Sequence, residues 1–186
     1  MSNLLLDKNL RSLKTVTTNE EKVVEASIIA RALTLNVLRN LSPHRKSNIL
    51  RFLYEMELIR CDNDKFVLGK NYYGEKKIVS LSNADFSGTN LNQVILPYID
   101  LSDANLSGAD LRRVSLYRAN LSGADFSYAN FQGAYLVEAM LIEANLTGAN
   151  LAGANLEKAT YNSKTKWPEN FDLDLAGMEY TGLTRK

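Results

Sequence analysis

Cysteine and histidine are almost absent from this sequence, and both absences exclude kinds of site. The one cysteine, Cys61, cannot form an internal disulfide bond, and it suits a small apolar residue better than a reactive thiol. The one histidine, His44, cannot supply a site of several histidines. Neither a Gly-Lys-Ser/Thr phosphate loop nor a cluster of metal ligands occurs. We therefore expect no metal, no cofactor and no enzymatic activity.

Long apolar runs and an excess of one charge are missing as well. The first apolar run has three residues and ends at Asp7, too short for the core of a signal peptide. No run of about 18 apolar residues is present to cross a membrane. The 22 basic and 21 acidic residues leave a net charge of +1, which selects neither nucleic acid nor membrane as a partner. We expect a soluble protein of the cytoplasm.

What the sequence does contain is a five-residue repeat from 79 to 163 without insertion. Every fifth position is Leu, Phe or Tyr, from Leu81 to Tyr161, and two positions earlier stands a small or β-branched residue. A period of five fits neither the 3.6-residue turn of an α-helix nor the alternation of a flat strand. It fits a coil that turns one corner per unit and pairs with the coils above and below as in a β-sheet.

Four such units make a four-sided coil of twenty residues, so the repeat region predicts about four coils. Residues twenty apart then share a side, one above the other. Asn, Asp and Gly between the inward positions suit the corners, because they tolerate turn dihedrals and positive φ. We expect the stacked Asp and Asn residues to bond local backbone rather than to form catalytic pairs.

Individual units match the consensus A(D/N)LXX. Ala-Asn-Leu-Ser-Gly stands at 104–108 and Ala-Asn-Leu-Ala-Gly at 149–153. The sequence thereby resembles the pentapeptide-repeat family over 85 of its 186 residues, the segment 79–163. The resemblance implies a mainly β fold, a right-handed quadrilateral β-helix. The helical segment before the repeats is similar to that of many cyanobacterial members.

The N-terminal region lacks the five-residue period, and its residue pattern predicts an α-helical cap. Within 1–78 we expect a short leucine-rich helix, a second helix over about 19–40 and a third opened by Ser42-Pro43. A small hairpin is expected over 59–68. A cap is needed because a stack of coils ends in unpaired backbone and an open apolar core.

The C-terminal segment 164–186 predicts a second, shorter cap. The period stops after Tyr161, and Trp167 and Phe171 carry large rings that can plug the last coil. The last few residues are expected to fray.

Charge is unevenly placed along the chain. Residues 1–78 hold 14 basic and 9 acidic residues, and 79–163 hold 4 basic and 8 acidic. Nucleic-acid binding by a small winged-helix arrangement is therefore an alternative, but a solvated helical face is favoured over it. The basic residues concerned are Arg39, Arg45, Lys46 and Arg51. Some members of the family mimic duplex DNA and inhibit type II topoisomerases, but the net charge of −4 in the repeats makes a weak mimic.

One side of the predicted β-helix has unusual outward residues. The units centred on Leu96, Leu116 and Leu136 present apolar or aromatic groups, where the other sides mostly show Ser, Asn, Asp and Gly. Tyr and Arg dominate interface energies, and clustered exposed apolar groups mark contacts. We call the candidate partner-binding residues the tyrosine patch: Ile95, Pro97, Tyr98, Arg112, Arg113, Tyr117, Arg118, Tyr135 and Val137.

The tyrosine patch predicts a non-enzymatic scaffold that acts through protein–protein interaction with an unidentified partner. The alternative is local, namely that the N-terminal helices of the protein cover this side. The sequence sets neither the oligomeric state nor the identity of the partner.

Overall fold

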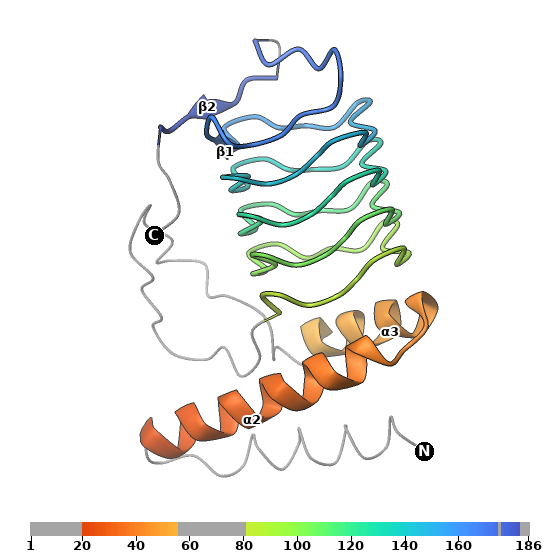
Figure 1. Cartoon of the computed structure of the whole chain (residues 1–186), viewed down its shortest axis with the longest axis vertical. Coiled ribbons are helices and arrows are strands. Elements are labelled where there is room, and N and C mark those ends of the chain that lie inside the picture. The colour runs from red at the N-terminus through yellow and green to blue at the C-terminus, as the bar shows by residue number, and fades with distance from the viewer. Residues whose placement is uncertain (1–19, 56–80, 175, 183–186) are drawn as a thin grey trace.

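The computed structural model describes residues 20–55, 81–174 and 176–182 (Figure 1). The predicted leucine-rich first helix, the hairpin predicted over 59–68 and Cys61 lie outside the described residues.

Among the described residues, two helices and two short strands accompany the repeats. Helix α2 spans Glu20–Arg39 and helix α3 spans Pro43–Glu55, so the predicted second and third helices are confirmed. Strands β1 (Thr160–Tyr161) and β2 (Glu179–Tyr180) pair in parallel at the far end of the chain. Figure 1 shows α2 and α3 below the stack of coils and β1 and β2 near its upper end.

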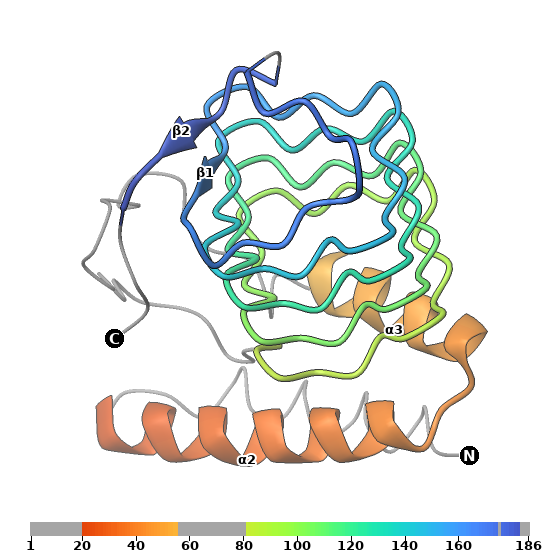
Figure 2. The same cartoon turned by 45° about the horizontal axis from the view of Figure 1, so that its top comes forward.

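The repeats fold into a stack of four-sided coils (Figure 2). Parallel bridges join residues twenty positions apart, from Asp85–Asn105 to Met140–Thr160. Backbone N–H groups donate from each coil to the next, as Leu121 does to the Met140 carbonyl at 2.9 Å. The predicted spacing of twenty residues is therefore confirmed.

The two inward positions of each unit form one continuous core. The large residues from Leu81 to Leu156 are at most 8% exposed, and the small residue two positions before them is buried in nearly every unit. Phe126 and Phe131 meet edge to face, with ring centroids 5.1 Å apart. Small residues are required beside the large ones because neighbouring sides converge at the corners.

The corners use the local chemistry that the sequence predicts. Asp125 Oδ1 accepts the Ser127 N–H at 3.0 Å, and Asn105 Oδ1 accepts that of Ser107 at 3.0 Å. The same bond recurs at most corners, so these side chains replace backbone partners. The second corner residue has positive φ, which is 67° at Gly133 and 53° at Arg113.

Helices α2 and α3 pack their apolar side chains on the first coil. Leu38, Leu50 and Leu53 are 0% exposed and belong to the same cluster as Leu81 and Phe86 of that coil. Burying these side chains together stabilises the contact by roughly 1.5–3 kcal/mol per side chain.

Polar contacts fix how the helices sit on the coil. From α2, Arg31 donates to the Ser82 hydroxyl at 2.9 Å. From α3, Lys46 Nζ lies 2.8 Å from Asp85 Oδ2, and the Lys46 side chain is only 4% exposed. A buried ammonium needs such a partner, because it is costly without one.

The Lys46–Asp85 pair makes this contact pH-dependent. Partial burial raises the pKa of Asp85, but hydrogen bonds from Lys46 and Ser87 outweigh it, and the pKa falls from 3.8 to about 2. A carboxyl with a lowered folded-state pKa stabilises the fold above its unfolded pKa, and this contribution is lost as the pH falls through the folded value.

We expect thermal unfolding to reveal this dependence. Wild type should melt above Asp85→Asn at pH 7, and the difference between their melting temperatures should shrink as the pH falls from about 4 to about 2. A difference that stays constant down to pH 2 would show that the Asp85 carboxylate does not stabilise the contact.

The last coil departs from the regular repeat. Asn145 bridges Lys166, one residue later than the spacing of twenty requires, so one extra residue enters the chain there. Trp167 and Phe171 then stack, with centroids 5.1 Å apart and planes 10° apart, and both pack on the core. The chain continues in turns to β2, which pairs with β1.

Candidate interaction surface

Three tyrosine rings form a connected ladder on one side of the stack. The centroids of Tyr98 and Tyr117 are 5.5 Å apart and edge to face, and those of Tyr117 and Tyr135 are 6.1 Å apart. Arg118 places its guanidinium carbon 5.2 Å from the centre of the Tyr117 ring. Because the rings come from successive coils, the backbone bridges between those coils fix their spacing.

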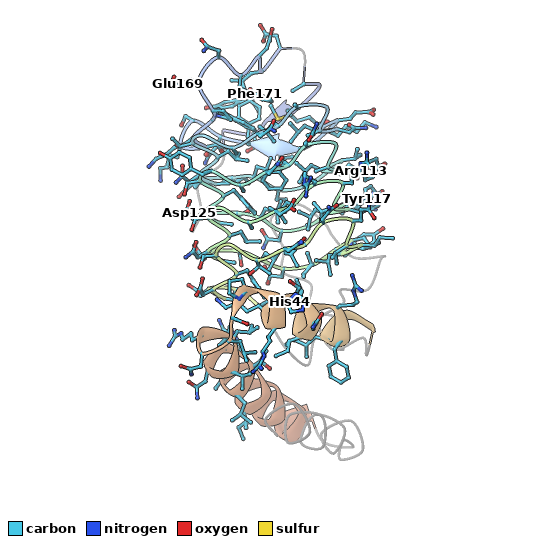
Figure 3. All side chains as sticks on the ribbon, turned by 90° about the vertical axis from the view of Figure 1, so that its right-hand side faces the viewer. His44, Arg113, Tyr117, Asp125, Glu169 and Phe171 are labelled. Atoms are coloured by element: carbon cyan, nitrogen blue, oxygen red, sulfur yellow. The ribbon has the colours of Figure 1, made fainter. Side chains whose placement is uncertain are left out.

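Much of this side is open to solvent. Ile95 is 64% and Tyr135 is 44% exposed, and Arg112 and Arg113 are exposed at the adjacent corner. Pro97, Tyr98, Tyr117 and Arg118 are half-buried. The described helices contact the first coil and leave these side chains uncovered, as Figure 3 shows for Arg113 and Tyr117.

Val137 is the exception within the tyrosine patch, because it is only 8% exposed. It was predicted to point outward with the others. Its short side chain lies at the same corner as the larger Tyr117 one coil earlier, so it offers little surface of its own. Val137 therefore contributes little surface for a partner to contact.

Two of the three arginines of the tyrosine patch are held by neighbouring carboxylates. Arg112 donates through two nitrogens to Asp110, at 2.8 and 2.7 Å, and this bond raises the pKa of Arg112. Arg118 Nε lies 2.6 Å from Glu138 Oε2, which raises the pKa of Arg118. Within the described part of the chain, Arg113 makes no ion pair.

A shallow groove of about 450 Å³ runs along the corner that carries Arg113. Its lining includes Gln93, Arg112, Arg113, Gln132, Gly133 and Gly153. The sequence pattern placed the two arginines in the tyrosine patch but did not indicate the groove. The available signal was the change from Gln and Arg to Gly along one corner of successive coils.

The basic residues of the N-terminal region differ in their exposure to solvent. Arg39, Arg45 and Arg51 are exposed, whereas Lys46 is buried against the first coil and paired with Asp85. Including Lys46 in a nucleic-acid surface was therefore wrong, because its charge is already neutralised inside the protein. His44 is exposed at the start of α3 (Figure 3).

Among the described residues, no three His, Cys, Asp or Glu side chains gather closely enough to bind a metal ion. Neither described helix has the length and apolarity needed to cross a membrane.

The chain is similar in sequence to known repeat proteins. Pentapeptide repeats match the chain in eight copies, over residues 99–136 and 119–157. A pentapeptide repeat protein from Nostoc Pcc 7120 is 43% identical over 52% of this chain and 84% of its own, with a TM-score of 0.30. No curated protein matches the chain.

Two further solved structures are similar at lower identity. The pentapeptide repeat protein Rfr23 from the cyanobacterium Cyanothece 51142 is 32% identical over 48% of this chain and 58% of its own, with a TM-score of 0.30. One from the thylakoid lumen of Arabidopsis thaliana is 31% identical over 52% of this chain and 70% of its own, with a TM-score of 0.31.

Stacked four-sided coils of five-residue units define a β-helical repeat protein. The chain belongs to the pentapeptide repeat family. The fold that the family implies, a right-handed β-helix, agrees with the bridges between residues twenty apart.

Proposed function

We propose that this protein is a non-enzymatic scaffold that binds a protein partner through the tyrosine patch. The observation that carries the proposal is the ladder of Tyr98, Tyr117 and Tyr135, whose rings touch across successive coils beside the exposed Ile95. Serine, asparagine, aspartate and glycine occupy most corresponding positions on the other sides.

The rigidity of the stacked coils favours binding at the tyrosine patch. Every coil is bonded to its neighbours through the backbone, so the tyrosines are held in place before a partner arrives. Binding then costs little side-chain entropy, and large amphipathic rings contribute much of the energy at such interfaces. The cation–π contact and ion pair of Arg118 hold the Tyr117 ring further.

Caps at the two ends of the stack of coils belong to the proposed scaffold. Helices α2 and α3 would shield the apolar end of the first coil, and the turns between β1 and β2 would shield that of the last. A stack of coils that is closed at both ends exposes no long strand edge for unwanted pairing.

Affinity capture from an extract of the source organism tests the proposal. We expect wild type to retain a protein that Tyr117→Ala/Tyr135→Ala loses, because truncating two clustered rings removes roughly 2 kcal/mol or more of binding energy. Tyr128→Ala is the matched control, since Tyr128 is 75% exposed and lies on another side of the stack of coils. A captured protein that all three chains retain would contradict the proposal.

Nucleic-acid binding by α2 and α3 is the weaker candidate. Arg39, Arg45 and Arg51 remain exposed, but Lys46 is not available to a phosphate. Salt-sensitive micromolar binding of duplex DNA, measured by fluorescence anisotropy, would favour it over the scaffold. Mimicry of DNA is weaker still, because Arg112, Arg113 and Arg118 interrupt the acidic repeats.

A location in the cytoplasm belongs to the proposal as well.

A further inference from the structure

Arg113 differs from the other arginines of the tyrosine patch. Arg112 and Arg118 are each held by a carboxylate of this chain, whereas Arg113 is exposed and makes no ion pair with any described residue. A guanidinium presents donors in a planar fork that matches a carboxylate, so an unpaired one on a binding surface favours an acidic partner.

The surroundings of Arg113 leave room for such a group. Gly133 follows at the same corner one coil later, and a Cβ there would come within 3.5 Å of the Arg113 side chain. Gly153 follows one coil further, and the missing side chains leave the groove of about 450 Å³ open beside Arg113. The amides of Gln93 and Gln132 line it and offer further donors.

The groove borders the apolar side of the tyrosine patch. Two positions after Arg113 in the chain comes Ser115, which bridges to Ile95 one coil earlier and to Tyr135 one coil later. Ile95 and Tyr135 are thus two coils apart, about 10 Å at the spacing of a β-sheet. An extended chain covers that distance in about three residues.

We propose that the partner docks as an extended acidic peptide segment, with an Asp or Glu carboxylate bound by Arg113 and apolar side chains on Ile95 and Tyr135. The inference rests on the proposed function and adds the chemistry of the partner. Carboxylate and guanidinium form two parallel hydrogen bonds in this arrangement, and binding weakens as salt screens the pair.

The chain offers a conservative variant with a matched control. Arg113 has a φ of 53°, and Gln93 occupies the same corner one coil earlier with a φ of 59°. Arg113→Gln therefore places a glutamine in a backbone conformation that glutamine already adopts at this corner. Lys158 is also exposed, has a φ of 57° and makes no ion pair within the described residues. Lys158→Gln therefore removes the same charge away from the groove.

The test selects random twelve-residue peptides, displayed on phage, on the full-length wild-type chain. We expect the selected peptides to be rich in Asp or Glu next to apolar residues. In fluorescence anisotropy, Arg113→Gln should weaken their binding roughly tenfold and reduce its dependence on salt, whereas Lys158→Gln should leave the affinity unchanged.

The outcomes separate this inference from the proposed function. Peptides that lose binding in Tyr117→Ala/Tyr135→Ala but keep it in Arg113→Gln overturn the acidic segment and leave the scaffold standing. Peptides unaffected by either variant contradict both. Selection of no peptide, or of peptides without acidic residues, overturns the inference. So does self-association of wild type that Arg113→Gln abolishes, because the occupant would then be a second copy of this chain.

Discussion

Leu121→Asp is expected to prevent folding of the β-helix and to abolish soluble expression. Leu121 is 0% exposed in the middle of the stack, and its register places it between Leu101 and Leu141. A carboxylate there would be buried without a partner, at a cost of several kcal/mol or more. That is a large part of the roughly 5–15 kcal/mol by which a domain is stable. Soluble yield and circular-dichroism melting measure the effect.

An outward carboxylate serves as the control for Leu121→Asp. Asn150 is exposed, and its Oδ1 accepts the Ala152 N–H at 3.0 Å, a bond that an aspartate can also make. Asn150→Asp should therefore express and melt like wild type. If Leu121→Asp did the same, the inward register described for the repeats would be wrong.

Removal of residues 1–75 should cause the remaining stack of coils to aggregate or to associate end to end. The deletion removes Leu38, Leu50 and Leu53, and so uncovers the apolar end of the first coil at Leu81 and Phe86. Unpaired backbone at that end would pair with another chain. Light scattering coupled to size-exclusion chromatography would show large or concentration-dependent species.

The full chain at the same concentration is the reference for the truncated one. A monomeric fragment of residues 76–186 that melts with the full chain would contradict the capping role. It would make α2 and α3 an independent module, and would strengthen the case for nucleic-acid binding through the exposed arginines.

Most of the stack of coils could be predicted from the sequence, because the period of five determines which residues point inward and which form the corners. The inward columns that begin at Leu81, the corner bonds of Asn and Asp and the stacking of residues twenty apart all follow from that period. Helices α2 and α3 were predictable from local signals such as the Ser42-Pro43 start.

The rest depends on contacts that no local pattern encodes. The Lys46–Asp85 pair joins residues 39 positions apart, and nothing near Lys46 indicates that it is buried. The groove beside Arg113 arises from unequal side chains at one corner of successive coils. The extra residue before Lys166 lies where the repeat pattern has already ended.

Photocrosslinking tests the central claim, that the tyrosine patch contacts a protein partner, most directly. A photoreactive phenylalanine derivative replaces Tyr135 in one chain and Tyr128 in another, since both side chains are exposed but lie on different sides. We expect position 135 to yield a covalent adduct with the captured protein and position 128 to yield none. An adduct formed from position 128 but not from position 135 would contradict the claim.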